Sequence, residues 1–293
     1  MSKSNEATRD FIRDNYARVA QSGAALSCCA PNNALSCCAP STAGCCSPGS
    51  VNPCCGPVTD AVTASMKLGY SASDLEIIPG ESNMGLGCGN PVALAELREG
   101  ETVLDLGSGG GIDCFLAAQR VGLSGKVIGV DMTPEMIKLA RKNASEGNHT
   151  NVEFRLGEIE HLPVEDDSID AIISNCVINL SPDKAQVFCD AFRVLKPGGR
   201  ISISDIVAVA EIPQEMRDNM ALIAGCVGNA EHIEVIEQLM LEAGFVDVEL
   251  VLQDNLREII ASWFPESKAA EYVTSCIIQG RKPYKDNNTP NFG

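Results

Sequence analysis

The sequence predicts an α/β protein whose sheet is mostly parallel and covered by helices on both faces. After residue 100, short apolar segments alternate with segments of helical periodicity. Continuous apolar strands separated by helices are typical of a parallel sheet that is buried on both sides. The last two apolar segments do not follow the usual parallel crossover pattern, so we expect them to form an antiparallel edge.

Each element follows from a local pattern, and seven segments are predicted to contain strands. These are TVLDLG (102–107), KVIGVD (126–131), VEFRLGE (152–158), AIISNCVINL (171–180), RISISDIV (200–207), FVDVELVL (245–252) and YVTSCIIQG (272–280). Helices are predicted at 113–121, 133–144, 181–195, 213–225, 231–243 and 256–264. The second of these should begin with Thr133 as N-cap and Pro134 at the first helical position, and the third with Ser181 and Pro182.

The N-terminal region reads differently from the rest. Residues 7–21 predict a short amphipathic helix with Phe11, Ile12, Tyr16 and Val19 roughly on one side. Cys-Cys pairs then recur at 28/29, 37/38, 45/46 and 54/55 in a segment rich in Ser, Pro, Gly and Asn, which predicts a flexible tail. We therefore divide the chain into residues 1–59, a cofactor-binding domain at 60–208, and a lid with closing strands at 209–293.

Composition excludes several classes of function. The 293 residues are 45% hydrophobic and 21% charged, as in ordinary globular proteins. The net charge of −17 disfavours nucleic acids, because such a chain repels phosphate backbones. We find no apolar run of 18 residues and no apolar region at the N-terminus, so we expect a cytoplasmic monomer without a membrane partner. In that compartment the fourteen cysteines favour reduced thiols over a disulfide scaffold.

The turn after the first strand is the first candidate binding site. VLDLGSGGGID places Asp105 at the end of the strand and Gly107, Gly109 and Gly111 in the turn, where a ligand can approach the backbone closely. Asp131 ends the second strand, where a carboxylate can accept both ribose hydroxyls. The G-x-G-x-G spacing disfavours NAD, whose sites carry G-x-G-x-x-G.

The segments DLGSGGG, GVDMTPEM, GEIEHLP and LKPGGR resemble those of the class I S-adenosylmethionine-dependent methyltransferases. The resemblance implies a Rossmann-like, seven-stranded fold and a set of cofactor contacts. Gly107, Ser108 and Gly109 would line the methionyl end and Asp131 would hold the ribose, with Asp105 behind the turn. Met132 would pack on adenine, Glu158 and Ile159 would meet its edge, and Asn175 would border the methyl group; for Met132 and Ile159, core packing is the alternative.

Cysteines occupy the positions where a methyltransferase would usually place a base. Cys88 lies in GLGCGNP, Cys176 in SNCVINLSP at the end of the fourth strand, and Cys226 in AGCVGNA. Neither His161 nor His232 is placed persuasively, His149 should be solvated, and Cys114, Cys189 and Cys276 should be core residues. Three soft thiolates without imidazole suit a three-coordinate thiophilic centre better than tetrahedral zinc. Trivalent arsenic is such a centre, and its lone pair needs no base for methylation.

In these cysteine contexts the chain closely resembles bacterial and algal arsenite S-adenosylmethionine methyltransferases, over roughly residues 60–255. The resemblance implies that Cys88, Cys176 and Cys226 carry arsenic from arsenite or its thiol conjugates. It also implies successive methylations and a thiol reductant such as thioredoxin or glutathione. Because thiolate is the ligand form, we expect arsenic binding to release protons and to weaken at low pH.

Related enzymes often carry a cysteine or a Cys-Cys segment ahead of this domain. Adjacent cysteines rarely bond to each other, because the local geometry is strained. We therefore expect the repeat to capture arsenite and pass it to Cys88, Cys176 and Cys226. Deleting residues 24–57 should then raise the arsenite concentration needed for half-maximal rate. A redox-active or merely tolerated tail is the alternative.

Two other functions remain open from the sequence. A carbon or oxygen methyltransferase of a small molecule such as a quinone shares the cofactor motifs, and it would work without arsenic. A protein that only sequesters a metalloid or metal would bind it through thiols without forming S-adenosylhomocysteine. Activity with purified protein, arsenite and the methyl donor separates the three.

Overall fold

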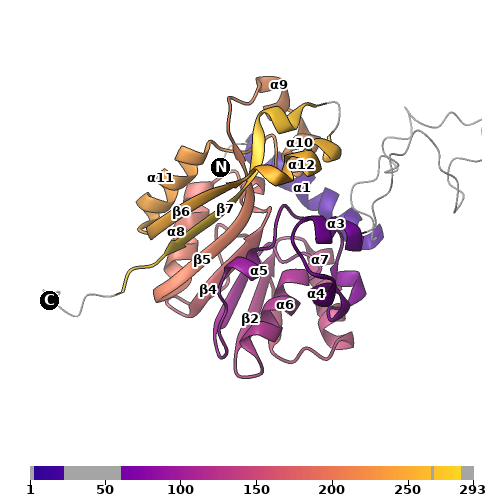
Figure 1. The fold of residues 1–293 in the computed structure, drawn as a ribbon, viewed down its shortest axis with the longest axis vertical. Coiled ribbons are helices and arrows are strands. Elements are labelled where there is room, and N and C mark those ends of the chain that lie inside the picture. The colour runs from indigo at the N-terminus through magenta and orange to yellow at the C-terminus, as the bar shows by residue number, and fades with distance from the viewer. Residues whose placement is uncertain (1–2, 23–60, 265–266, 285–293) are drawn as a thin grey trace, which may run out of the picture.

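A computed structural model of the chain describes residues 3–22, 61–264 and 267–284, and its centre is one sheet of seven strands. The order across the sheet is β3-β2-β1-β4-β5-β7-β6 (Figure 1). The strands are β1 Thr102–Leu106, β2 Lys126–Asp131, β3 Val152–Leu156, β4 Ile169–Asn175, β5 Leu195–Ala208, β6 Val246–Gln253 and β7 Val273–Arg281. All seven predicted strands are confirmed, with ends that differ by a few residues.

The direction of the strands follows the sequence pattern. β1 to β5 pair in parallel, and β7 pairs antiparallel with both β5 and β6. The predicted antiparallel edge is therefore confirmed. β6 and β7 complete the sheet that β1 to β5 begin. The predicted division of the chain into domains at residue 208 stays a prediction.

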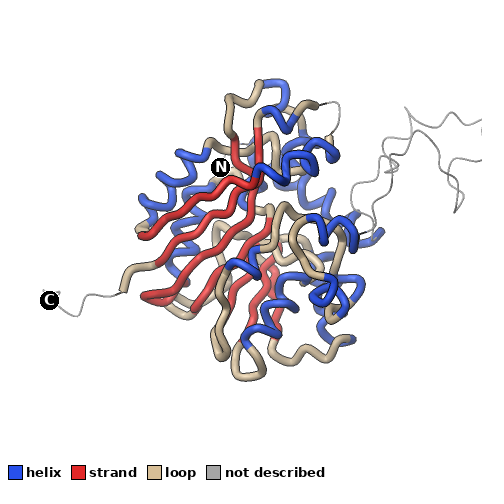
Figure 2. The backbone as a smooth tube through the Cα atoms, in the orientation of Figure 1, coloured by secondary structure: helices blue, strands red, loops and turns tan. Residues whose placement is uncertain are grey.

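Helices lie on both sides of the sheet, as Figure 2 shows in blue against the red strands. They are α1 Lys3–Ser22, α3 Ala61–Lys67, α4 Ala72–Glu76, α5 Pro91–Leu94, α6 Ile112–Val121, α7 Pro134–Glu146, α8 Lys184–Val194, α9 Gln214–Arg217, α10 Met220–Ala224, α11 Ile233–Ala243 and α12 Arg257–Trp263. Short 3₁₀ turns are η1 Gly80–Ser82, η2 Ile178–Leu180, η3 Asp254–Leu256 and η4 Ala269–Glu271. In Figure 1, α9, α10 and α12 gather above one end of the sheet.

Alternating side chains bury both faces of the parallel strands. In β1, Leu104 and Leu106 pack in the core under α8 and α11, whereas Val103 packs in the core under α5, α6 and α7. In β2, Val130 joins the first core and Val127 the second. Two buried faces explain why these strands are apolar throughout rather than at every second residue.

Two predicted helix boundaries were wrong, each because of a capping side chain. α8 begins at Lys184, since the Asp183 side chain accepts a hydrogen bond from Gln186 N, while the Ser181 hydroxyl bonds to Glu160 instead. The predicted helix at 213–225 is broken into α9 and α10. Asn219 caps the second piece by accepting from the backbone N–H groups of its first turn.

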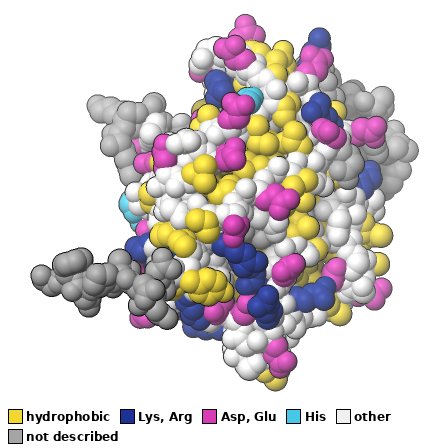
Figure 3. All heavy atoms as spheres, turned by 60° about the vertical axis from the view of Figure 1, so that its left-hand side comes forward, with side chains coloured by type: hydrophobic (Ala, Val, Ile, Leu, Met, Phe, Trp, Pro, Cys, Tyr) yellow, Lys and Arg dark blue, Asp and Glu magenta, His cyan; other side chains and the backbone are white. Residues whose placement is uncertain are grey.

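The sequence of the outer strand β6 discourages pairing with a strand of another molecule. It leaves Val246, Val251 and Leu252 exposed, and Figure 3 shows hydrophobic side chains between acidic and basic ones on the face that it displays. Asp247 has a left-handed φ of 51°, and the pairing register shifts between Val246 and Glu249. Bulges and charges of this kind discourage pairing with another strand.

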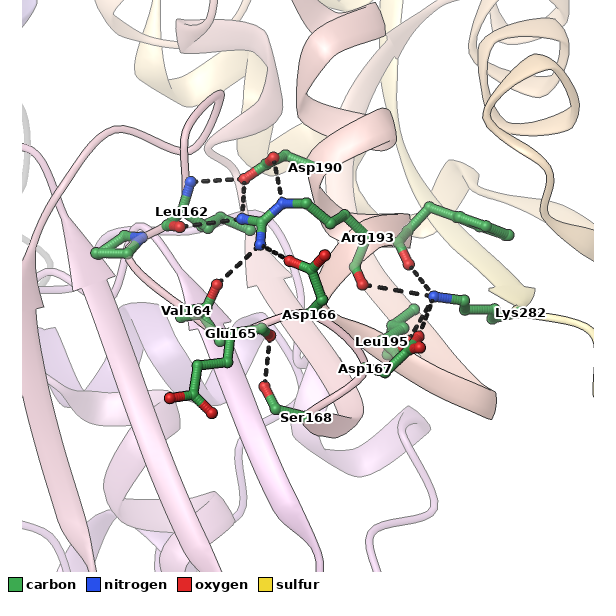
Figure 4. A network of polar contacts seen from close by, with 12 residues as sticks. Leu162, Val164, Glu165, Asp166, Asp167, Ser168, Asp190, Arg193, Leu195 and Lys282 are labelled. Carbon is green, nitrogen blue, oxygen red and sulfur yellow. Dashed lines mark hydrogen bonds and ion pairs between the residues drawn. The ribbon is translucent and has the colours of Figure 1, made fainter. Parts of the chain in front are cut away.

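A network around Arg193 holds the loop that follows residues 158–161 (Figure 4). The guanidinium binds both carboxylate oxygens of Asp190 at 2.9 Å and Asp166 at 2.6 Å, and it also donates to the carbonyls of Leu162 and Val164. Asp190 in turn accepts from Leu162 N at 2.6 Å. The loop is thus fastened to the last turn of α8.

Replacing Arg193 by alanine is expected to lower the free energy of unfolding by about 2 kcal/mol, because it leaves the buried carboxylate of Asp190 without its charged partner. The measurement is urea denaturation followed by circular dichroism. Lys126→Ala is the matched control: its pair with Glu153 is exposed on both sides, so the loss should stay below about 1 kcal/mol. Equal losses in the two variants would contradict the role given to this network.

The N-terminal expectations fall partly inside and partly outside the residues that the structure describes. α1 is confirmed as an amphipathic helix, with Ile12 and Val19 buried. The Cys-Cys pairs and the expectation that they capture arsenite lie outside the described residues. Among the residues that the structure describes, no helix is long and apolar enough to cross a membrane.

Candidate cofactor and thiol site

The glycine-rich turn lies between β1 and α6, as predicted. The backbone N–H groups of Gly107 and Ser108 donate to Val130 O of β2, which ties the turn to the next strand. A Cβ at Gly107 would lie 2.4 Å from Val177, so packing alone requires glycine there. At Gly109 (φ +51°) the nearest atom to a Cβ would be the tip of Met84, at 3.4 Å. Gly109 is therefore the least crowded glycine of the turn.

Ser108 has a buried hydroxyl that the protein does not satisfy. Its side chain is 5% exposed, and its Oγ has no hydrogen-bond partner among the described residues. A buried polar atom without a partner points to a missing ligand or water. This hydroxyl, which follows Gly107 in the turn, fits a polar ligand group.

Asp131 stands at the end of β2, partly exposed beside the turn. Its two oxygens accept from Gly109 N at 3.0 Å and from Thr133 N at 2.8 Å. Burial raises the pKa of Asp131, and the two backbone bonds oppose that shift. Each carboxylate oxygen retains acceptor capacity. The arrangement fits a ligand with neighbouring hydroxyls, such as a ribose.

The other predicted cofactor residues surround this turn in different ways. Asp105 is buried and accepts from Cys114 Sγ at 3.2 Å, and burial followed by the charge of Asp113 raises the pKa of Asp105. Met132 is half-buried after Asp131, whereas Ile159 belongs to the core under α8. Glu158 is half-buried and pairs with arginines of α1. The alternative of core packing thus gains support for Ile159.

The three predicted cysteines come together at the carboxyl end of the sheet. Cys226 Sγ donates to Cys176 O at 2.8 Å. The sulfurs of Cys88 and Cys176 and a carboxylate oxygen of Asp205 all lie within 4.8 Å of one another. Cys88 Sγ also donates to Ser204 O at 3.3 Å. Residues far apart in the sequence therefore form one thiol cluster.

Two of these cysteines have unusual backbone conformations. Cys176 has a φ of 60° and Cys226 a φ of 63°, which is the left-handed region. Cys176 N donates to Ser204 O at 2.8 Å, so the backbone of Cys176 is still attached to β5 just after the end of β4. Such conformations cost about 1–3 kcal/mol and cluster at functional sites. Here they bring two sulfurs to the same point.

Burial keeps the thiols protonated at neutral pH. Desolvation raises the pKa of Cys88 to about 11. For Cys226, the hydrogen bond with Cys176 and then burial raise the pKa well above the usual value. In Cys176 the hydrogen bond with Cys226 lowers the pKa, but the hydrogen bond with Cys88 and burial outweigh it. Burial and the hydrogen bonds among the three cysteines thus favour their thiol forms over thiolates.

Asp205 is a site residue that the sequence reasoning missed. It is 1% exposed and accepts from Ile178 N, Asn179 Nδ2 and Ile206 N. Desolvation raises its pKa to about 6. The sequence did carry a signal for it, because Asp205 is the one charged residue in the predicted strand segment SISDIV. Asp205 holds the turn after Cys176 onto β5.

The loops of Cys176 and Cys226 are also fastened to each other. Asn229 Nδ2 donates to Asn179 O at 3.0 Å and to Ser181 O at 3.1 Å. The buried ammonium of Lys184 donates to Asn229 O at 2.9 Å. The pair of cysteines is thereby held by contacts that do not involve Cys88.

Helix α1 covers the space between the cofactor turn and Cys226. Tyr16 donates to Ala224 O at 3.1 Å, and Arg9 pairs with Glu160 at 2.7 Å. Val19 packs with Met84 and Met136 beside the turn. The sequence predicted the helix and its apolar side but not this position, because contacts across 208 residues have no local signature.

The other cysteines and histidines that the structure describes lie outside the thiol cluster. Cys114 and Cys276 are buried as predicted, but the expectation for Cys189 was wrong, since it lies exposed on the outer side of α8. His149 is half-buried against Phe115 with ring centroids 4.6 Å apart, so it is less solvated than expected. His161 is exposed, and His232 lies at the start of α11.

The chain is similar to several known proteins. Residues 97–262 match the family described as a methyltransferase domain. An arsenite methyltransferase of Halobacterium salinarum is 45% identical over 282 residues, which are 96% of this chain and 68% of that protein. One of Aquipseudomonas alcaligenes is 43% identical over 183 residues, 60% of this chain and 52% of that protein. This chain thus spans about half to two thirds of their lengths.

Among solved structures, the chain is similar to CrArsM, an arsenic (III) S-adenosylmethionine methyltransferase from Chlamydomonas reinhardtii. The TM-score is 0.53 at 34% identity, over 78% of this chain and 74% of that one. The two chains are thus alike both in fold and in sequence.

Proposed function

This chain belongs to the arsenite methyltransferase family, and from that premise we propose that it methylates trivalent arsenic held by the sulfurs of Cys88, Cys176 and Cys226. The observation that carries the proposal is the thiol cluster beside the cofactor turn. A soft, three-coordinate ion matches three sulfurs with one carboxylate nearby better than a hard cation does. The proposed substrates are arsenite, which can bind three sulfurs, and methylarsenite, which can bind two.

S-adenosylmethionine, when bound, supplies an electrophilic methyl group on a sulfonium. We assign its ribose to Asp131, whose carboxylate retains acceptor capacity, and a polar group of its methionyl end to Ser108 Oγ. The placement agrees with Gly109, between them, being the least crowded glycine of the turn. Met132 and Glu158 remain the candidates for the adenine end.

The thiols of this chain hold the substrate and leave its lone pair free. Arsenous acid carries three hydroxyls, and each exchanges with one thiol as an As–S bond forms and water leaves. Because arsenic bound to three sulfurs has no proton to lose, no general base is needed. Orientation then supplies most of the rate gain, on the order of 7–11 kcal/mol.

The exchange changes the expected dependence on pH. Each proton of a neutral thiol departs in a water molecule, and arsenous acid is itself neutral near pH 7. With the pKa of Cys88 at about 11, the cysteines bind arsenite in the protonated form throughout the neutral range. The sequence-based expectation, that binding releases protons and weakens at low pH, stays a prediction; exchange from protonated thiols favours the opposite outcome.

We predict that the dissociation constant of arsenite changes by less than about threefold between pH 6 and pH 8, because no net proton is exchanged. Isothermal titration in phosphate and in Tris should give the same binding heat, since these buffers differ in ionisation enthalpy. Binding that weakens about tenfold for each unit by which the pH rises, with unequal heats, would show instead that a thiol is already ionised before arsenite binds.

The deciding experiment incubates the purified chain with arsenite, S-adenosylmethionine and a thiol. Arsenic species are separated and identified by mass, and S-adenosylhomocysteine is quantified in parallel. We expect methylated arsenic in step with S-adenosylhomocysteine. Arsenite binding without S-adenosylhomocysteine would indicate a sequestration protein. Methyl transfer to a quinone without arsenic would indicate the small-molecule methyltransferase, which the relatives do not favour.

We extend the proposal to a thiol reductant, thioredoxin or glutathione, that keeps these cysteines reduced between turnovers. Omitting the thiol should then stop methylation after the first turnovers while cofactor binding persists. A cytoplasmic monomer stays the expected state of the protein, and light scattering coupled to size exclusion measures its mass.

A further inference from the structure

The side-chain amide of Asn175 is paired with the backbone of the turn that carries Cys88. Cys88 N donates to Asn175 Oδ1 at 2.9 Å, and Asn175 Nδ2 donates to Gly89 O at 2.9 Å. Two opposed bonds of this kind fix both the distance and the orientation of the turn. Since Asn175 is the last residue of β4 and precedes Cys176, they set one cysteine against the other.

Close packing makes this contact possible only with glycine on both sides of Cys88. A Cβ at Gly87, where φ is +119°, would lie 2.7 Å from Asn175 Nδ2. A Cβ at Gly89 would lie 2.6 Å from Ser204 Oγ. The turn is thus pressed onto the ends of β4 and β5, which explains the GLGCGNP sequence by contact.

The amide is in turn held from the cofactor side. Asn175 Nδ2 lies 2.9 Å from the Tyr70 hydroxyl, which donates to Asp113 Oδ1 at 2.7 Å. Tyr70 and Asp113 are 3% and 4% exposed, so the network is buried. Asp113 belongs to the first turn of α6, directly after the glycine-rich turn. One chain of hydrogen bonds therefore connects the cofactor turn to Cys88.

This use of Asn175 differs from the cofactor contact that the family resemblance implied. An amide nitrogen has two N–H groups. Those of Asn175 already face three protein acceptors, namely Tyr70 Oη, Gly89 O and, at 3.4 Å, an oxygen of Asp113. The donors of Asn175 are thus committed within the protein.

We propose that Asn175 is a positioning residue for Cys88, which places the third sulfur against the Cys176–Cys226 pair. The inference rests on the proposed function, because it concerns the arsenic ligands. According to the proposal, the position of Cys88 depends on the side-chain amide of Asn175. The other two cysteines are held together without it, by the Cys226 Sγ bond to Cys176 O and by Asn229.

Two arsenicals separate these contributions. Arsenous acid can exchange three oxygens for sulfur, but phenylarsine oxide offers arsenic with only two exchangeable positions. We expect Asn175→Ala to raise the dissociation constant of arsenite on the order of tenfold to a hundredfold, from the loss of two hydrogen bonds that fix a ligand. The dissociation constant of phenylarsine oxide should stay within about twofold, because the two-thiol pair is unchanged.

X-ray absorption at the arsenic edge should count fewer sulfur neighbours in Asn175→Ala than in the wild-type protein. Cys88→Ser should reproduce the same pattern, and the double variant should bind arsenite no more weakly than either single one, because both remove one ligand. Tyr70→Phe keeps the shape of the ring and should shift arsenite binding in the same direction by about threefold to tenfold. Tyr70→Phe tests the same proposal if the Asn175→Ala protein does not fold.

Asn151→Ala is the matched control. The side-chain amide of Asn151 also donates to two backbone carbonyls, those of Ala118 and Gly122, but away from the thiols. It should leave both arsenicals unaffected. Equal weakening of arsenite and phenylarsine oxide in Asn175→Ala, or additive losses in the double variant, would overturn the proposal. So would weakened S-adenosylmethionine binding with arsenite binding intact, which would return Asn175 to the cofactor. Wild-type protein that makes no methylated arsenic would instead remove the proposed function itself.

Discussion

Replacing Cys176 by serine is expected to lower kcat/KM for arsenite methylation by about a thousandfold or more, since a hard hydroxyl replaces a soft ligand of arsenic. Serine fits the same left-handed backbone position and the same half-buried volume. The fold should therefore survive, and the loss should be chemical. Steady-state rates measured by arsenic speciation give the answer.

Cys226→Ser should behave in the same way, because its sulfur contacts Cys176 at the carbonyl oxygen and at the thiol. The double variant should be no slower than either single one, as is usual for residues that act as a unit. Cys189→Ser is the matched control, since that thiol is exposed on α8 and should be dispensable. If Cys176→Ser retained more than about a tenth of the wild-type activity, its sulfur could not be a ligand of the reacting arsenic.

Replacing Asp131 by alanine is expected to weaken S-adenosylmethionine binding about a hundredfold, the effect of losing two hydrogen bonds to a charged acceptor. The change also releases the backbone N–H groups of Gly109 and Thr133, so the turn loses its anchor. Titration calorimetry without arsenite measures the cofactor alone.

Asp170→Ala provides the comparison for this second variant. Asp170 also accepts a backbone N–H, from Thr102 at 2.8 Å, and pairs with Lys196, but it lies at the start of β4. It should lower stability without changing cofactor affinity. An Asp131→Ala protein that binds the cofactor as tightly as Asp170→Ala would exclude the ribose role of Asp131.

Much of the fold could be predicted, because its signals are local. The strands from β1 to β5 are apolar throughout since both faces are buried, and Thr133 with Pro134 marks the start of α7. The start of α8 and the break between α9 and α10 were missed. Asp183 and Asn219 cap α8 and α10 with their side chains. The sequence offered other capping residues, such as Ser181, that were equally plausible.

By itself, the sequence determined the strand segments, the glycine turn with Asp131 and, through its family resemblance, the identity of Cys88, Cys176 and Cys226. Only the tertiary structure decided how these residues work. The amide of Asn175 reaches Cys88 across 87 residues, Tyr16 reaches Ala224 across 208, and Asp205 stands beside the thiols. The pKa of Cys88 rises to about 11 because neighbours from several elements exclude water from it. Local propensity encodes the elements, but desolvation and hydrogen bonds between distant segments exist only once those elements have packed.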